Sequence, residues 1–405
     1  MARNDPPTLV SLLTPLGEGG ISVIALSGPH AVSIILPLFR PPRGRILKSP
    51  APGKLYYGHL YDDDELLDEV LLAFFPPDNS LTGGEMVEIN CHGGIAPANA
   101  VIQALVRRGA ADADPQDLFR ASVDSGKLDP IQAEAALLIP HAPSTQAAAL
   151  LLAQYRGALS GELTHIAELL ASGKTRSARD RLQQLLTRWE LAQKLLSPPM
   201  IVLAGKTNVG KSTLINVLLG YERVIASDQP GTTRDHVTEP VGAMNAVLQL
   251  VDTAGLHGPD DTLSKEAERR THRLLEEADV IVFLFVAGSP LSQEESAVLA
   301  DLRGRSLIPV AAKADLGSGP AVEKVHDLTG VQPILVSSVT GQGIEKLNEE
   351  MSRLAAIPAA SPAAPSPFTE SQAGALREIA RLLDSGSSPE EIARRLRLLT
   401  PEAKA

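Results

Sequence analysis

Residues 202–220 read "VLAGKTNVGKSTLINVLLG", and this stretch decides the fold of the central part of the chain. An apolar run ends at Gly205, a Gly-x-x-x-x-Gly-Lys-Ser motif follows, and apolar residues then recur at helical spacing. The glycines let successive backbone N–H groups curl around phosphate oxygens, Lys211 adds a point charge, and the Ser212 hydroxyl can bind Mg²⁺. This strand–loop–helix context predicts a nucleotide-binding loop. Its expected contacts are Asn208, Val209, Gly210, Lys211, Ser212 and Thr213.

Two downstream segments indicate the γ-phosphate side of the same site. The first, "SDQPGTTRD" at 227–235, places Thr233 where the threonine of a switch loop reaches the metal and the γ-phosphate. The second, "LVDTAG" at 250–255, places Asp252 where it can hold a metal-bound water, and the Gly255 amide can contact the γ-phosphate. Motifs in this order are typical of a GTPase. The expected contacts are Ser227, Asp228, Gln229, Pro230, Gly231, Thr232, Thr233, Asp252, Thr253, Ala254 and Gly255, with Ser212 and Thr233 as Mg²⁺ ligands.

The stretch "PVAAKADLG" at 309–317 is close to the Asn-Lys-x-Asp loop that reads guanine, with Ala312 in place of the asparagine. Asp315 can accept hydrogen bonds from guanine N1–H and the exocyclic amine together, which adenine cannot offer, and the Lys313 stem covers the base. The missing asparagine would bond guanine N7 and tie this loop to the phosphate loop, and its loss costs about 1–3 kcal/mol. Further on, Ser337 and Ser338 can offer backbone N–H groups to the guanine carbonyl. We therefore expect GTP in preference to ATP.

The remaining sequence predicts a multidomain chain of the α/β and α+β classes. Short apolar runs separated by Gly, Pro and Asp predict a small α+β domain over 1–115, and helical spacing predicts a helical domain over 116–198. Strand-length apolar runs alternate with helical stretches over 199–356, which predicts a doubly wound, mainly parallel sheet. A Pro/Ala/Ser linker and two further helices occupy 357–405. The helices on both sides of the GTPase segment could form one bundle into which that segment is inserted.

Composition limits the class of protein. A formal net charge of −11 argues against a protein that coats nucleic acid nonspecifically, because phosphate contacts need Lys and Arg. The single cysteine, Cys91, excludes an internal disulfide and a thiolate metal cluster, and a buried structural thiol is its expected role. No apolar run reaches bilayer-spanning length, and "MARNDPPTLVSLLTPLG" lacks the basic start and apolar core of a signal peptide. We therefore expect a soluble, cytoplasmic protein without membrane contact.

Three stretches outside the GTPase motifs carry a family resemblance. They are "LLTPLGEGGISVIALSG" at 12–28, "FFPPDNSLTGGEMVEINCHGG" at 74–94 and "SGKLDPIQAEAALLI" at 125–139. With the GTPase motifs, they make nearly the whole chain resemble the bacterial tRNA modification GTPases known as MnmE or TrmE. A GTPase domain in general does not need these stretches, so their combination is specific.

The resemblance implies a set of partners and ligands. It implies a homodimer, an N-terminal dimerisation domain that binds a formyl- or methylene-tetrahydrofolate, and a flavin-dependent partner with which the wobble uridine of tRNA is modified. The folate residues that match are Glu88 and Lys127. In the family, K⁺ supplies positive charge near the phosphates once the GTPase domains dimerise. The matching K⁺ ligands are Asn208, Ser227, Gln229 and Thr232.

Several positions depart from the family pattern. Leu256 cannot orient a water as the glutamine of many small GTPases does, and the family's water-orienting glutamate falls on Ser264. Glu266, two residues on, is either its substitute or a charge on a helix surface, so the expected catalytic residues are Glu266, Asp252 and Gly255, with slow hydrolysis. Ala25 replaces a folate-site arginine. The family ends in Cys-Ile-Gly-Lys, whereas this chain stops at "LLTPEAKA", and we expect it to be a divergent member lacking that tail.

Three functions remain open at this point. The first is a tRNA modification GTPase with a changed folate pocket. The second is a dimeric GTP-dependent switch or assembly factor that has lost the modification role. The third is a ribosome-assembly GTPase, which would usually carry an RNA-binding module in addition.

Overall fold

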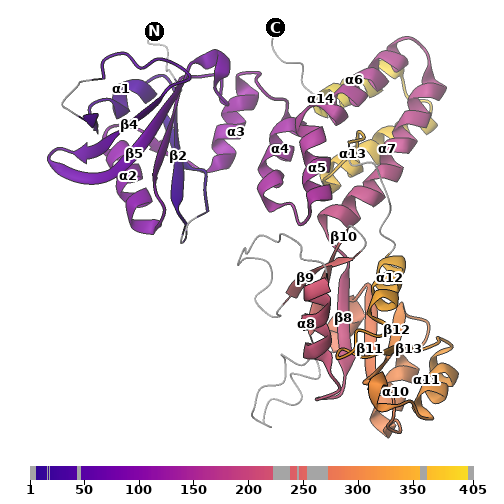
Figure 1. Cartoon of the computed structure of the whole chain (residues 1–405). Helices are drawn as coiled ribbons and strands as arrows, with labels where there is room; N and C mark the ends of the chain where they lie inside the picture. Colours follow the sequence, from indigo (N-terminus) through magenta and orange to yellow (C-terminus); the bar gives the residue numbers. More distant parts are fainter. Residues whose placement is uncertain are drawn as a thin grey trace. The chain divides into compact units, whose positions relative to one another are not determined.

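The computed structural model of the protein describes residues 6–15, 17, 19–42, 47–221, 238–243, 246–252, 272–355 and 363–399. The chain divides into two compact units. One comprises Met1–Pro140, Gln154–Asp180 and Glu378–Ala405, and the other comprises His141–Ala153 and Arg181–Arg377. The division passes within three α-helices: α5 (Thr145–Tyr155), α7 (Thr175–Leu196) and α13 (Glu370–Asp384). Figure 1 traces the chain and labels its helices and strands where there is room.

The N-terminal part is built on a seven-stranded sheet, which confirms the α+β prediction. The strands follow the order β3-β4-β5-β6-β2-β1-β7, and all neighbours pair antiparallel except β1 and β7. Helices α1 and α2 pack with it around a core that includes Ile24, Leu72, Ile89 and Leu105. The elements are β1 (Leu9–Leu12), β2 (Ile21–Ser27), α1 (Ala31–Ile35), β3 (Phe39–Arg40), β4 (Leu55–Asp62), β5 (Glu65–Phe75), β6 (Met86–His92), α2 (Ile95–Arg107) and β7 (Ala111–Asp112).

Helices follow on both sides of the GTPase segment. Capping boxes start two of them: Asp114 precedes α3, and Asp129 precedes α4, whose Gln132 N–H donates to the Asp129 carboxylate at 2.9 Å. The C-terminal helix α14 packs against α6. The Arg179 Nη2 of α7 lies 3.1 Å from the Asp384 Oδ1 of α13. The helices are α3 (Pro115–Asp124), α4 (Pro130–Leu138), α5 (Thr145–Tyr155), α6 (Ala158–Ala171), α7, α13 and α14 (Pro389–Leu399).

The chain returns from the GTPase segment to a single residue of α7. The Arg188 Nη1 donates to the Pro365 carbonyl at 3.1 Å, and the Ser366 hydroxyl donates to the Arg188 carbonyl at 3.3 Å. Phe368, two residues further on, is buried. These contacts hold the returning chain close to the end of the helix from which the segment departs.

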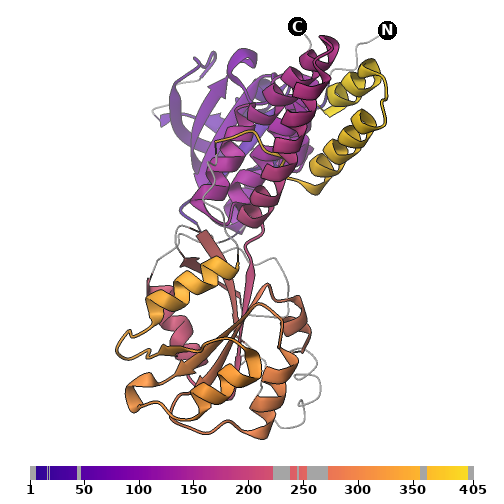
Figure 2. The same ribbon diagram turned by 90° about the vertical axis from the view of Figure 1, so that its right-hand side faces the viewer.

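The GTPase segment forms the doubly wound sheet that the alternating pattern predicts. Its order is β13-β12-β11-β8-β10-β9, with all neighbours parallel except β9 and β10. Helices lie on both faces of this sheet in Figure 2, with one apolar core on each face. The elements are β8 (Met200–Gly205), α8 (Lys211–Tyr221), β9 (Thr238–Ala243), β10 (Ala246–Asp252), β11 (Val280–Val286), α10 (Gln293–Asp301), β12 (Leu307–Ala312), α11 (Ala321–Thr329), β13 (Ile334–Val336) and α12 (Ile344–Leu354).

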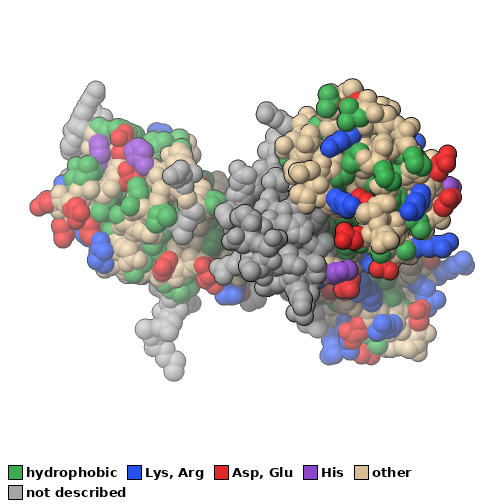
Figure 3. All heavy atoms as spheres, turned by 90° about the horizontal axis from the view of Figure 1, so that it is seen from below, with side chains coloured by type: hydrophobic (Ala, Val, Ile, Leu, Met, Phe, Trp, Pro, Cys, Tyr) green, Lys and Arg blue, Asp and Glu red, His purple; other side chains and the backbone are tan. Residues whose placement is uncertain are grey.

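The surface carries both signs of charge. On the face shown in Figure 3, Lys and Arg side chains lie among Asp and Glu side chains. In the ranges that the structure describes, no helix combines the length and the apolar character needed to cross a bilayer.

Candidate nucleotide-binding site

The phosphate loop turns at a point where only glycine fits. Gly205 ends β8 with a φ of +139°, and a Cβ added there would lie 2.3 Å from the Leu284 carbonyl oxygen of β11. Gly210, just before α8, also has a positive φ, of +114°. The loop therefore passes directly against the neighbouring strand and delivers residues 211–213 to the first turn of α8, where backbone N–H groups face outward.

Lys211 is held inside this loop by main-chain oxygens. Lys211 is only 4% exposed, and its Nζ donates to the carbonyls of Gly205 at 2.7 Å and Lys206 at 3.0 Å. These bonds fix the ammonium at the centre of the loop, beside the N-terminus of α8. A positive charge and a helix N-terminus at one point form a site for phosphate.

A lysine joins the guanine loop to the phosphate loop. Both Lys313 and Asn208 adopt positive φ values, of 58° and 64°, and the Lys313 Nζ donates to the Asn208 carbonyl at 3.1 Å. The asparagine that Ala312 replaces was expected to make such a tie, so the tie exists here through a different residue. Sequence reasoning missed this bond, although the retained lysine was the available signal.

The predicted base-reading residues meet in one cavity of about 290 Å³. Asp315 and Lys313 enter it from the end of β12, and Ser338 enters from the end of β13. The cavity is lined by Val209, Gly210, Thr213, Leu214, Leu284, Ala312, Lys313, Asp315, Leu316, Val336, Ser338 and Val339. Phosphate-loop and base-loop residues therefore share one site at the carboxyl ends of parallel strands, where nucleotides bind in doubly wound sheets.

Ser337 has a different place from its neighbour. It is fully buried, and its hydroxyl accepts hydrogen bonds from the N–H groups of Val339 at 3.3 Å and Thr340 at 3.2 Å. Its side chain thus shapes the turn that presents Ser338, and it does not line the cavity described above.

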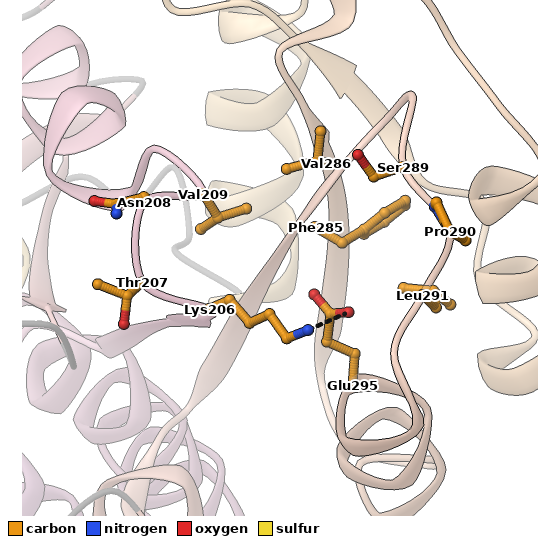
Figure 4. Close-up of a pocket in the computed structure, with 10 residues that line it drawn as sticks. All are labelled: Lys206, Thr207, Asn208, Val209, Phe285, Val286, Ser289, Pro290, Leu291 and Glu295. Carbon is orange, nitrogen blue, oxygen red and sulfur yellow. Dashed lines mark ion pairs between the residues drawn. The ribbon is translucent and has the colours of Figure 1, made fainter.

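A second cavity, of about 150 Å³, is lined in part by residues 206–209 of the phosphate loop (Figure 4). Figure 4 shows Lys206 extending from the loop toward Glu295 of α10, and the Lys206 Nζ lies 3.4 Å from the Glu295 Oε2. The same carboxylate accepts the Ser292 N–H at 2.8 Å, while the Ser292 hydroxyl accepts the Glu295 N–H at 3.2 Å. Glu295 therefore has two roles: it completes the capping box that starts α10, and it pairs with Lys206 of the phosphate loop. Sequence analysis missed the pair, although Ser-x-x-Glu at 292–295 is a helix-start signal.

The other predicted phosphate and catalytic residues are placed only in part. Asp252 is the last residue of β10, and its backbone pairs in register with Leu203 of β8, at the sheet edge that carries the phosphate loop. Outside the described residues lie Ser227, Asp228, Gln229, Pro230, Gly231, Thr232, Thr233, Thr253, Ala254, Gly255, Leu256, Ser264 and Glu266. Within the described part of the chain, no cluster of three His, Cys, Asp or Glu residues could hold a metal ion.

The two folate candidates lie in the N-terminal part and have separate partners. Glu88 of β6 is opposite Ala25 of β2, and its Oε1 accepts the Asn90 side-chain amide at 3.0 Å. Lys127 follows α3, and its Nζ donates to the Asp78 carbonyl at 2.7 Å. Ala25 is fully buried, so the position that an arginine holds in the family is a core position here.

Cys91 is a structural thiol, as expected. It is 2% exposed, its Sγ donates to the Ser22 carbonyl at 3.5 Å, and burial raises the pKa of its thiol to about 11. A thiol of this kind is not a nucleophile near neutral pH.

Comparisons with known proteins match both sheets. The family model for the GTP-binding protein TrmE N-terminus matches residues 8–126, and the model for the 50S ribosome-binding GTPase matches residues 200–313. The tRNA modification GTPase MnmE of Bacillus licheniformis is 30% identical over an alignment of 376 residues, and the match covers 86% of this chain and 82% of that protein. The protein of the same description from Moorella thermoacetica is 34% identical over 376 residues, 86% of this chain and 81% of that protein.

Solved structures of other proteins that match the GTPase segment add little to the family assignment. The G domain of the T. maritima FeoB iron transporter is 24% identical and covers 39% of this chain and 98% of that one, with a TM-score of 0.30, too low to support a structural argument. The chain-long matches decide the assignment, because they extend through the N-terminal sheet and the helices as well as the nucleotide site. The chain belongs to the family of tRNA modification GTPases MnmE.

Proposed function

We propose that this protein binds GTP with Mg²⁺, hydrolyses the γ-phosphate and uses this cycle in the modification of tRNA. The observation that carries the proposal is the cavity in which Asp315, Lys313 and Ser338 meet residues of the phosphate loop. The carboxylate of Asp315 suits the two N–H donors on the guanine edge. Lys211, held by two carbonyls, is positioned for the phosphates at the other end of the nucleotide.

The metal ions fit the donors that the chain offers. Mg²⁺ needs few protein ligands when phosphate oxygens supply the rest, so the hydroxyls of Ser212 and Thr233 are sufficient. Bound Mg²⁺ would neutralise charge on the phosphates. For K⁺ we propose Asn208, Ser227, Gln229 and Thr232. The Asn208 backbone has a positive φ, and its carbonyl accepts a hydrogen bond from the Lys313 ammonium.

We further propose a homodimer that works with a flavin-dependent partner and tRNA in the cytoplasm. A tetrahydrofolate would use Glu88 and Lys127, because a carboxylate can accept pterin N–H groups and an ammonium can pair with a carboxylate tail. The buried Ala25 offers no charge for that tail. A folate here would therefore bind with one ionic contact fewer than the family pattern provides.

Exchange of the base contact tests the GTP assignment. In Asp315→Asn the side-chain amide matches xanthine, whose C2 oxygen replaces the guanine amine, so affinity should move from GDP toward XDP. Isothermal titration of the full chain with GDP, XDP and ADP measures this, with Lys211→Ala as the variant that should weaken all three. Preference for ADP in the unmodified protein, or an unchanged base preference in Asp315→Asn, contradicts the assignment.

The tRNA role needs a separate experiment. Mass spectrometry of wobble uridine in tRNA from a deletion strain, complemented with the unmodified gene or with Lys211→Ala, should show modification restored only by the former. Unchanged modification in the deletion strain would reject this role and leave the GTP-dependent switch or assembly factor. The family matches do not favour that alternative, since the relatives compared above are described as tRNA modification GTPases.

A further inference from the structure

Residues with apolar side chains line one wall of the base cavity. Ala312, the last residue of β12, is 7% exposed and pairs in register with Val286 of β11 and Val336 of β13. Leu284 and Val336 line the cavity beside it and belong to the same apolar core as Ala312. The position from which a side-chain amide would reach the base therefore presents a methyl group among other apolar groups.

The donors elsewhere in the cavity have other positions or partners. Thr213, Lys313 and Ser338 are the lining residues whose side chains carry a hydrogen-bond donor. The Lys313 ammonium donates to the Asn208 carbonyl at 3.1 Å. Thr213 lies in the first turn of α8. Ser338 lies two residues beyond Val336, the last residue of β13, and its backbone N–H is the group expected to face the guanine O6.

The chemistry of guanine sets which atom faces this wall. Around the base, the exocyclic amine, N1–H, the carbonyl O6 and N7 follow in that order. Asp315 takes the first two, and the backbone N–H at Ser338 suits O6, so N7 comes next, toward the strand ends at Ala312 and Val336. N7 is an acceptor that water satisfies in solution, and an apolar wall leaves it without a donor.

We propose that this guanine site does not read N7, and that it takes guanine nucleotides of the 7-deazaguanine class, in which a C–H replaces N7, at least as well as GTP and GDP. This inference rests on the proposed GTP binding. A C–H at that position has no hydrogen bond to lose on leaving water, so its burial against Ala312, Leu284 and Val336 is favourable. The Asn-Lys-x-Asp form of the loop would instead penalise the same change.

The test is the ratio of two dissociation constants, for 7-deaza-GDP and for GDP, measured by isothermal titration on the full chain. In the unmodified protein the ratio should be one or below. In Ala312→Asn a new bond to N7 should tighten GDP by about tenfold and raise the ratio to about five or more. Ala312→Leu is the matched control, because leucine has nearly the shape of asparagine without its donor, and its ratio should stay at one or below.

The outcomes separate this inference from the proposed function. A ratio of five or more in the unmodified protein would overturn it, because some other group must then donate to N7. An unchanged ratio in Ala312→Asn, with GDP still bound, would overturn it as well. Failure of both nucleotides to bind the unmodified protein would instead reject GTP binding itself.

Discussion

Replacing Glu295 should weaken the start of α10 and the phosphate loop together. Its carboxylate accepts the Ser292 N–H at 2.8 Å and lies 3.4 Å from the Lys206 Nζ. Loss of a capping contact costs about 1 kcal/mol. The ion pair adds about 0.5 kcal/mol, since the Glu295 side chain is 11% exposed but Lys206 is 49% exposed and screened by water. We expect Glu295→Ala to lower the local free energy of unfolding by about 1.5 kcal/mol.

Glu295→Gln is the matched variant, because glutamine also serves in a capping box but carries no charge. It should lower the same free energy by about 0.5 kcal/mol. Hydrogen–deuterium exchange of peptides that cover residues 292–301, measured on the full chain at several urea concentrations, reports this quantity locally. GDP titration should show weaker binding in both variants, and the loss of affinity should be larger in Glu295→Ala than in Glu295→Gln. The reason is that Lys206, the partner of Glu295, supplies one of the carbonyls that hold Lys211. Equal exchange in the alanine variant and the unmodified protein would refute the reasoning.

Three further outcomes are expected. Gly205→Ala should abolish GDP binding in titration, because its Cβ would lie 2.3 Å from the Leu284 carbonyl oxygen. The control Gly161→Ala lies inside helix α6, where the added Cβ meets nothing within 4 Å, and should retain binding. His92→Gln should destabilise the protein in acid only, because the protonated His92 ring donates a hydrogen bond to the Asp68 carboxylate and this bond raises the pKa of His92. The stability that His92 contributes is complete below the unfolded-state pKa of about 6.5 and is lost as pH rises through the higher folded-state pKa, which urea unfolding at a series of pH values will follow. Iodoacetamide near neutral pH should leave Cys91 unmodified in the folded chain and alkylate it in urea, because burial raises the pKa of that thiol to about 11; alkylation at equal rates would contradict this.

The elements predicted well from sequence are those whose signal is local. The phosphate loop is recognised by two glycines and a lysine within eight residues. The alternation of strands and helices over the GTPase segment predicts a doubly wound sheet. The two-residue strands β3 and β7 carry no such signal, because they are too short to show a period. They form only when neighbouring strands offer backbone partners.

The contacts that organise the site were beyond sequence reasoning for a related reason. Whether Glu295 meets Lys206, or Lys313 meets Asn208, depends on how segments distant in the sequence pack, and the sequence of neither segment specifies its partner. Motif comparison identified Ala312 as a loss. The structure adds that Leu284 and Val336 line the cavity beside it. Because these neighbours are apolar, the replacement bears on which guanine nucleotides the site accepts as well as on how tightly it binds them.

The two contacts at Arg188 bear on the entropy of closing the long loop that the inserted GTPase segment forms. Because Pro365 and Ser366 return to the helix that the GTPase segment leaves after Leu196, the ends of a very long loop are held at one place. The entropy lost in closing a loop grows only with the logarithm of its length, and a folded domain within it removes most of that freedom beforehand. For the helices, a complete nucleotide-binding domain is then little more costly than a short turn. The size of the inserted domain therefore has only a weak effect on the entropy of bringing its two ends together at Arg188.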